Sequence, residues 1–183
     1  DQLKAEAVAV MRAHAPAKAT VFVGAAVVSP LFRRLADDPR IVGILRHIMP
    51  DGVAFMSDKI VFKSGAQRFA SPWHIDAFYW RNTRPKLSVW IALDDVAADN
   101  GALIVVRGSH RQEWQSATSD MRDTNGEFNN VIEQKTWRPE DEVICEVPRG
   151  SAIFFSDLLV HASCENTAGK DRFSLIQIGR AHV

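Results

Sequence analysis

The chain has 183 residues, of which 46% are hydrophobic and 24% are charged, as expected for one globular domain with a substantial core. Twenty-two basic residues balance twenty-two acidic ones, so the net charge gives no reason to expect nucleic acid or an anionic membrane as a partner. The longest apolar run, Ala19 to Val28, has ten residues, whereas a membrane-spanning helix needs about 20. Two cysteines are too few for a disulfide scaffold, so we expect a reducing, cytoplasmic location.

The first 50 residues are predicted to be helical. The opening segment DQLKAEAVAVMRAHA is rich in good helix formers and ends before Pro16. In SPLFRRLADDPRIVGILRHIM, Ser29 is the predicted N-cap with Pro30 at the first helical position, and a second short helix is expected over Arg40 to Met49. The chain opens without a methionine, and we expect further residues before it.

From residue 53 onward the pattern changes to that of strands. Short apolar or alternating runs are separated by Gly, Pro, Asn and Asp, and they cover 53–62, 87–93, 102–106, 142–147, 151–155 and 173–179. Such spacing is typical of an antiparallel sandwich or barrel. The pair Asn100-Gly101 is a strong turn signal, and VPRGS at 147–151 is predicted to be a hairpin turn.

The predicted fold class is therefore α+β, mainly β. We expect one domain over 1–183, with a helical part at 1–50 and a β core at 53–183. A polar, irregular stretch at about 111–141 is expected to be a long insert, and inserts of that length are usually functional or mobile.

The motif SPWHID contains the first candidate metal ligands. If this segment is extended, His74 and Asp76 point to the same face, because side chains alternate along a strand. His161 follows a second apolar run, where an imidazole is costly to bury unless it is paired or ligated. Two imidazoles and one carboxylate on one face of an octahedron suit non-haem Fe(II) oxygen chemistry. His110, in GSHR, is a candidate fourth ligand by residue type alone.

Arg172 lies eleven residues after His161 and opens the next strand-like run. Its planar guanidinium can grip a carboxylate through two parallel hydrogen bonds, which suits the distal carboxylate of 2-oxoglutarate. Ser163 lies two residues after His161 and would add a hydroxyl donor on the same face. Taken singly, each is as simply explained by a solvated arginine or a loop hydroxyl.

Three stretches together resemble the phytanoyl-CoA dioxygenase family of Fe(II)- and 2-oxoglutarate-dependent oxygenases. They are SPWHIDAFYW, LSVWIALDDVAADNGALIVVRGSHR and GSAIFFSDLLVHASCENTAGKDRFSL. They occur in the family's order, and the similarity extends from about residue 53 to the end. Family members are generally longer at both ends, so we expect this chain to be incomplete at both ends.

The resemblance implies a double-stranded β-helix, or jelly roll, of the cupin-like kind. It implies Fe(II) held by His74, Asp76 and His161, 2-oxoglutarate held by Arg172 and Ser163, and O2 as the oxidant. A carboxylate at position 76 favours hydroxylation, desaturation or ring formation over halogenation, because related halogenases have a small residue there.

Two further positions, Met56 and Trp90, match residues that line the cosubstrate pocket of the family, although the residue pattern alone explains both as strand core. The chain departs from the family at Ile75, where glutamine is common between the two ligands. The departure removes a polar contact near the cosubstrate without touching the ligands.

A small-molecule substrate is expected, and its contacts are the least constrained part of the interpretation. Phe78 and Trp80 follow the first two ligands and form either an aromatic wall of the site or part of the core. Lys59 and Lys63 alternate on a strand leading to the site and either meet a substrate anion or are solvated edge lysines. The sequence does not indicate the oligomeric state.

Two alternatives belong to other classes of protein. One is a non-catalytic jelly-roll binding protein that retains the metal site. The other is a cupin-like enzyme or zinc hydrolase on a similar barrel. The first is disfavoured because the candidate ligands and Arg172 are all present. A cupin-like enzyme is disfavoured because the His-x-His pattern with a nearby glutamate is absent, and a zinc hydrolase because it would need no carboxylate-binding arginine after the last ligand.

Overall fold

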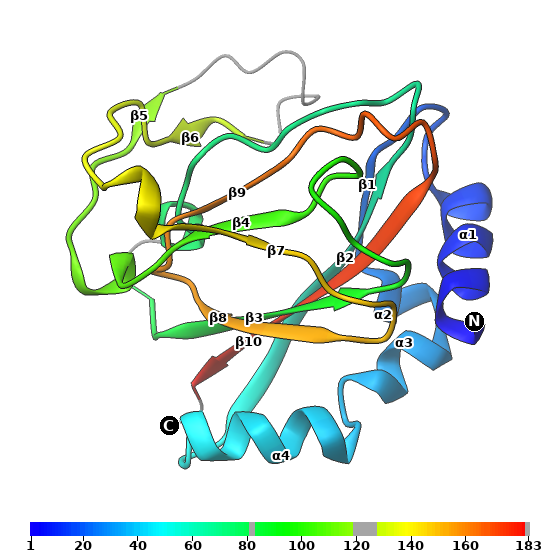
Figure 1. The fold of residues 1–183 in the computed structure, drawn as a ribbon. Coiled ribbons are helices and arrows are strands. Elements are labelled where there is room, and N and C mark those ends of the chain that lie inside the picture. Colours follow the sequence, from blue (N-terminus) through cyan, green and yellow to red (C-terminus); the bar gives the residue numbers. More distant parts are fainter. Residues whose placement is uncertain (81–82, 119–127, 182–183) are drawn as a thin grey trace.

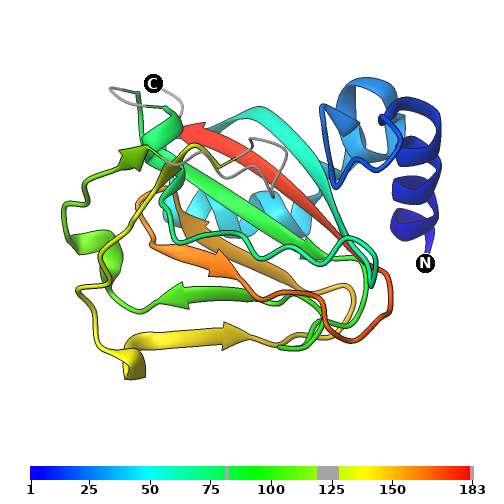
Figure 2. The ribbon, with the colours of Figure 1, turned by 90° about the horizontal axis from the view of Figure 1, so that it is seen from above.

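The computed structural model describes residues 1–80, 83–118 and 128–181. Two antiparallel sheets face each other, and helices cover the outer face of the larger one (Figure 1, Figure 2). In chain order the helices are α1 Gln2–His14, α2 Ala25–Val28, α3 Pro30–Leu35 and α4 Pro39–Ile48, with short 3-10 helices η1 Asp76–Tyr79, η2 Ser109–Arg111 and η4 Pro139–Asp141. Among the described residues, no helix has both the length and the apolar character needed to cross a bilayer.

The larger sheet has the strand order β1-β2-β10-β3-β8 and the smaller one the order β7-β4-β9. The strands of the larger sheet are β1 Val21–Val23, β2 Val53–Lys63, β10 Arg172–Ala181, β3 Lys86–Ala92 and β8 Ala152–Ser156. Those of the smaller sheet are β7 Glu142–Cys145, β4 Leu103–Val106 and β9 His161–Ser163, and β5 Ala117–Thr118 pairs with β6 Asn130–Val131. The fold is the expected double-stranded β-helix preceded by helices.

Side-chain alternation on β2 separates the two sides of the larger sheet. Ile60 is fully buried and packs with Phe32, Leu175 and residues of α1 and α4 in the core between sheet and helices. The neighbours of Ile60 in sequence, Lys59 and Val61, face the space between the two sheets. One face of the sheet therefore stabilises the fold, and the other is available for chemistry.

The predicted start of α3 is confirmed. Ser29 accepts a hydrogen bond from the backbone N–H of Phe32, with Pro30 as the first residue of α3. Asp38 caps α4 in the same way, accepting from the backbone N–H of Arg40 at 2.9 Å. Both caps satisfy donors that a helix leaves unpaired at its first turn.

Two local predictions are wrong. The region before residue 50 is not wholly helical, because β1 pairs with β2 and extends the larger sheet. Its Val-Phe-Val sequence favours a strand, and Gly24 ends it at φ +86°.

The turn at 147–151 does not close a hairpin, since β7 and β8 belong to different sheets. The irregular insert at about 111–141 contains β5, β6 and η4, and its residues 119–127 lie outside the described part.

The turn at Gly101 sets how closely the β3–β4 connection approaches the larger sheet. Its φ is +95°, a conformation that residues with a side chain rarely adopt. A Cβ built at this position would lie 2.5 Å from the Cδ of Lys63 and 2.9 Å from Nη2 of Arg172. Only glycine allows both side chains to lie against this turn.

We predict that Gly101→Ala destabilises the protein by about 1–3 kcal/mol, because it combines an unfavourable φ with contacts that neither neighbour can avoid without moving. Gly43→Ala is the matched control, since Gly43 is exposed in α4 and a Cβ there would meet nothing within 4 Å. The control should stabilise by about 0.5–1 kcal/mol. Urea unfolding of both variants measures the difference, and equal effects at the two positions would contradict the explanation.

Candidate metal centre

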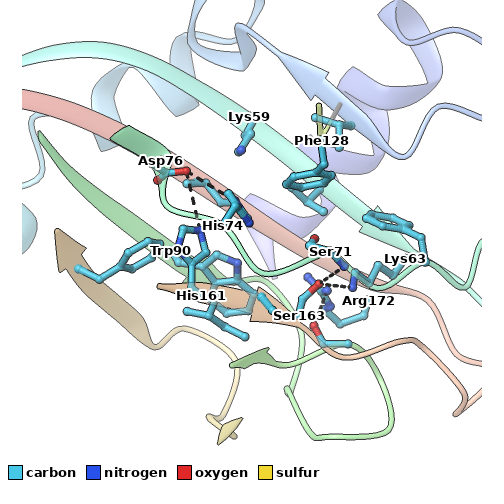
Figure 3. A pocket seen from close by; sticks show the side chains of 18 residues that line it. Lys59, Lys63, Ser71, His74, Asp76, Trp90, Phe128, His161, Ser163 and Arg172 are labelled. Atoms are coloured by element: carbon cyan, nitrogen blue, oxygen red, sulfur yellow. Dashed lines mark hydrogen bonds and ion pairs between the residues drawn. The ribbon is translucent and has the colours of Figure 1, made fainter. Parts of the chain in front are cut away.

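His74, Asp76 and His161 form a cluster at the wall of a cavity between the two sheets (Figure 3). One nitrogen from each ring and one carboxylate oxygen lie within 4.8 Å of one another. The Oδ1 atom of Asp76 is 3.9 Å from Nε2 of His74 and 3.8 Å from Nε2 of His161. Three atoms at these separations can surround one metal ion.

The backbone explains why the two histidines meet. His161 opens β9, and His74 forms an isolated antiparallel bridge with it. Each residue donates its backbone N–H to the carbonyl of the other at 3.0 Å. The His74 segment is not a full strand as predicted, because Asp76 begins η1. Ile75 between them is extended and buried on the opposite side, so His74 and Asp76 still project to one face.

Hydrogen bonds fix which nitrogen of each ring is available. Nδ1 of His74 lies 2.8 Å from the carbonyl oxygen of Pro72, and Nδ1 of His161 lies 2.8 Å from that of Leu159. A carbonyl only accepts, so each Nδ1 carries a hydrogen, and Nε2 is the atom that holds the lone pair in the neutral form of each ring. Such outer contacts orient metal-binding histidines. The Nε2 atoms are the ones that face Asp76.

The protonation states also suit a cation. Burial, followed by the nearby His161, lowers the pKa of His74 to about 3, so this ring is neutral near pH 7. Burial acts to raise the pKa of Asp76, but His161, Lys59 and His74 together with a hydrogen bond from Ser88 lower it on balance. Ser88 donates to Oδ2 at 2.8 Å, which leaves Oδ1 for the metal. A neutral imidazole and a carboxylate are the forms that bind metal ions.

Arg172, the first residue of β10, lines one end of the same cavity. Arg172 is only 2% exposed. It donates from Nε to the carbonyl of Asn100, from Nη1 to Ser174 and from Nη2 to the carbonyl of Gly101. A guanidinium has five N–H donors, so one hydrogen on each terminal nitrogen is not used by these bonds. Burial lowers the pKa of Arg172 to about 10, which keeps it charged at neutral pH.

Lys63 lies directly opposite Arg172 in the β2–β10 pair, and it is 1% exposed. Its Nζ donates to Oγ of Ser163 at 2.7 Å and to the carbonyl of Cys164 at 2.6 Å. Burial, and then the charge of Arg172, lower the pKa of Lys63 to about 7. Two cations side by side in a buried site are unfavourable unless an anion joins them.

Ser163 lies between these cations and the backbone. Its Oγ accepts hydrogen bonds from Lys63 and from the backbone N–H of Ser71, the latter at 2.9 Å. The hydroxyl hydrogen is therefore free to be donated into the cavity. Arg172, Lys63 and Ser163 together form a cationic end of the cavity, rich in hydrogen-bond donors.

Of the remaining predicted residues, some line the cavity and others lie outside it. Trp90 lines the cavity with the Arg172 guanidinium 5.6 Å from its ring centre, and Lys59 lines it near the metal cluster. Met56 lies outside the cavity and is 38% exposed, at a β-bulge where Ser57 pairs with Ile178 but Phe55 pairs with Gly179. Phe78 and Trp80 also lie outside it.

Phe78 is buried in a hydrophobic cluster with Ile75. Trp80 packs its ring against the ammonium of Lys86 at 5.4 Å. Two aromatic residues outside the prediction contact the cluster: the ring centre of Phe155 is 4.9 Å from that of His161, and the ring centre of Phe128 is 4.9 Å from that of His74. Phe128 follows the part of the insert that is not described, and no periodic pattern marks it in the sequence. His110 is exposed in η2, away from the cluster.

Comparison with known proteins gives matches over most of the chain. The family model for phytanoyl-CoA dioxygenase (PhyH) matches residues 3–174, so the similarity begins well before residue 53. The chain is 25% identical over 161 residues to L-proline trans-4-hydroxylase of Streptomyces griseoviridis, covering 78% of this chain and 60% of that protein. It is 30% identical over 151 residues to a probable alpha-ketoglutarate-dependent hypophosphite dioxygenase of Stutzerimonas stutzeri, covering 78% of this chain and 50% of that protein.

Among solved structures, the epimerase SnoN in complex with Fe3+, alpha ketoglutarate and nogalamycin RO superposes with a TM-score of 0.78 at 21% identity. The match covers 98% of this chain and 73% of that one, and it shows a common fold. The chain spans about half to 60% of the length of the curated relatives it matches. With a family model matched over residues 3–174, this chain belongs to the phytanoyl-CoA dioxygenase family.

Proposed function

We propose that the protein is an Fe(II)- and 2-oxoglutarate-dependent dioxygenase that hydroxylates, desaturates or cyclises a small molecule, with release of succinate and CO2. One observation carries the proposal. Two imidazole nitrogens and a carboxylate oxygen converge in the same cavity whose end holds Arg172, Lys63 and Ser163. A metal site and a carboxylate site within one cavity are what a chelating keto acid requires.

In this proposal His74, Asp76 and His161 hold Fe(II), which together with 2-oxoglutarate and O2 supplies the oxidising chemistry when bound. The set of donors fits the metal, since two histidines and one carboxylate on one face leave positions open for other ligands. Arg172, Ser163 and Lys63 bind the distal carboxylate of the cosubstrate, and Trp90 forms the adjacent wall. The protein orients both reactants and excludes water between its sheets.

The named relatives support the reaction class and leave the substrate open. They are described as acting on L-proline and hypophosphite, and another relative, from Sphingopyxis alaskensis, is an ectoine dioxygenase. A small molecule is therefore the substrate class we propose. Cys145 and Cys164 are both free thiols, which supports a cytoplasmic location for the protein.

Binding of the metal and the cosubstrate can be followed by visible absorption. Anaerobic addition of Fe(II) and then 2-oxoglutarate to metal-free protein should produce the weak visible absorption band of the iron chelate. His161→Ala should weaken Fe(II) binding by more than about 100-fold, because even contacts behind the ligands are commonly worth 10- to 100-fold. Arg172→Ala should retain iron but weaken 2-oxoglutarate binding, since the site loses its buried guanidinium.

His110→Ala is the matched control, because His110 is an exposed histidine outside the cluster, and it should behave as the unmodified protein. Normal iron binding without the band would contradict the 2-oxoglutarate assignment and leave another kind of iron enzyme. A protein that binds Fe(II) and 2-oxoglutarate but never forms succinate with any substrate would be the non-catalytic binding protein.

Binding of the cosubstrate should also depend on pH. In the free protein the pKa of Lys63 is lowered to about 7, and a bound carboxylate raises it by favouring the charged ammonium. Affinity for 2-oxoglutarate should therefore be highest below pH 7 and fall above it, by at most about tenfold per pH unit. Calorimetry of the iron-loaded protein in buffers of different ionisation enthalpy should detect proton uptake on binding at pH 8.

Lys63→Met should remove both the proton uptake and most of the pH dependence, with affinity at pH 6.5 reduced by about tenfold or more. Lys170→Met is the control, since Lys170 is an exposed lysine on the β9–β10 connection. If the unmodified protein binds 2-oxoglutarate equally well at pH 6.5 and 8.5, Lys63 does not contact the cosubstrate.

A further inference from the structure

The cavity has a second cationic position, Lys59, at a distance from Arg172 and Lys63. Lys59 and Lys63 are four residues apart on β2, so their backbones are separated by roughly 13 Å. In the β2–β10 pair Lys63 lies opposite Arg172, and Lys59 lies opposite Ile176, which itself neighbours Trp90 on β3. Figure 3 shows the Lys59 side chain pointing toward Asp76 and His74. Lys59 therefore lies beside the metal cluster, well away from Arg172 and Lys63.

Within residues 1–80, 83–118 and 128–181, the ammonium of Lys59 has no hydrogen bond or ion pair. Asp76 is the nearby carboxylate, but its Oδ2 already accepts from Ser88 and its Oδ1 faces the two histidines. The cavity wall around Lys59 includes the apolar side chains of Val61, Phe128 and Ile176. An ammonium next to such a wall lacks a polar partner from the protein.

The charges of the loaded site do not require Lys59. Fe(II) and the Asp76 carboxylate together carry one net positive charge, and Arg172 carries another. These two charges balance the two negative charges of 2-oxoglutarate, and a protonated Lys63 already leaves the site with one net positive charge. Lys59 thus brings a positive charge that neither the metal site nor the cosubstrate balances.

We propose that Lys59 binds an anionic group of the substrate, a carboxylate or an oxyanion of phosphorus, and holds it beside the metal centre. The inference rests on the proposed function, because it assigns the Arg172 end of the cavity to the cosubstrate. Lys59 is a substrate-binding residue in this role, and no proton transfer is assigned to it. The substrate class that follows is a small organic acid or phosphorus oxyacid.

The test uses the full chain loaded anaerobically with Fe(II) and saturating 2-oxoglutarate. Butyrate, its neutral counterpart butyramide, and methylphosphonate are titrated, and binding is followed by calorimetry and by the change in the visible band. The unmodified protein should bind the better of the two anions at least about tenfold more tightly than butyramide. Lys59→Met should weaken that anion by about 10- to 100-fold and leave butyramide within about twofold.

Three comparisons make the result specific to Lys59. Lys59→Arg keeps the charge and should restore most of the anion binding. Lys170→Met removes an exposed lysine elsewhere and should change nothing. The 2-oxoglutarate affinity of Lys59→Met should stay within about twofold of the unmodified value, and the same thermal unfolding temperature would show that the variant is folded.

Several outcomes overturn the inference. Equal binding of butyrate and butyramide, no binding of either anion, or anion binding that Lys59→Met leaves unchanged would each do so. Loss of 2-oxoglutarate affinity in Lys59→Met would also do so, by placing the residue at the cosubstrate. Absence of the visible band in the unmodified protein would instead overturn the proposed function, and the inference with it, before any variant is made.

Discussion

The pair of backbone hydrogen bonds between His74 and His161 is the contact on which the candidate site depends. Each residue donates to the other at 3.0 Å, although the two are far apart in the sequence and only β9 is a strand. This bridge joins the β2–β3 connection to the smaller sheet. It aligns the two rings, whose Nδ1 atoms are each tied to a carbonyl two residues earlier. Backbone pairing and these carbonyl contacts thus orient the Nε2 atoms of both rings, as is expected of metal-binding histidines.

At the cationic end of the cavity, two positively charged side chains lie close together between the sheets. Arg172 and Lys63 are directly opposite on β10 and β2, and both are nearly inaccessible to solvent. Their surroundings supply carbonyl oxygens and Ser163 as acceptors, and the bonds that these form remove part of the cost of burial. Gly101 makes the arrangement possible, because its bare backbone lets both side chains approach. Two buried cations held this close together favour binding of an anion between them.

Much of this arrangement could be predicted from sequence, because the informative signals are local. The spacing of His74 and Asp76, the Ser29-Pro30 helix start and the six alternating runs each depend on neighbours in the chain. The structure separates residues that local pattern treats alike. Lys59 and Lys63 look equivalent in the sequence, yet the register of β2 against β10 places only Lys63 opposite Arg172, whereas Lys59 lies opposite Ile176. Met56 was expected in the cavity, but it lies outside, as the unpaired residue of a β-bulge in β2. Phe128 lies in an irregular stretch without periodicity, so only tertiary packing reveals its position.

Between that bulge and Lys63 the alternation of β2 is unbroken, so every second side chain faces the cavity at a regular spacing. Lys59, Val61 and Lys63 are the three successive cavity-facing residues, and the backbone of each is about 6.6 Å from that of the next. Beyond the bulge, Phe55 and Val53 line the groove beside α4, so the series of cavity-facing residues ends at the bulge. If a charged side chain is moved by two residues along β2, the position at which it binds a ligand shifts by the length of several carbon–carbon bonds. The position of the metal does not change. A fold of this kind can thus change which atom of a ligand lies nearest the metal through single substitutions on one rigid strand.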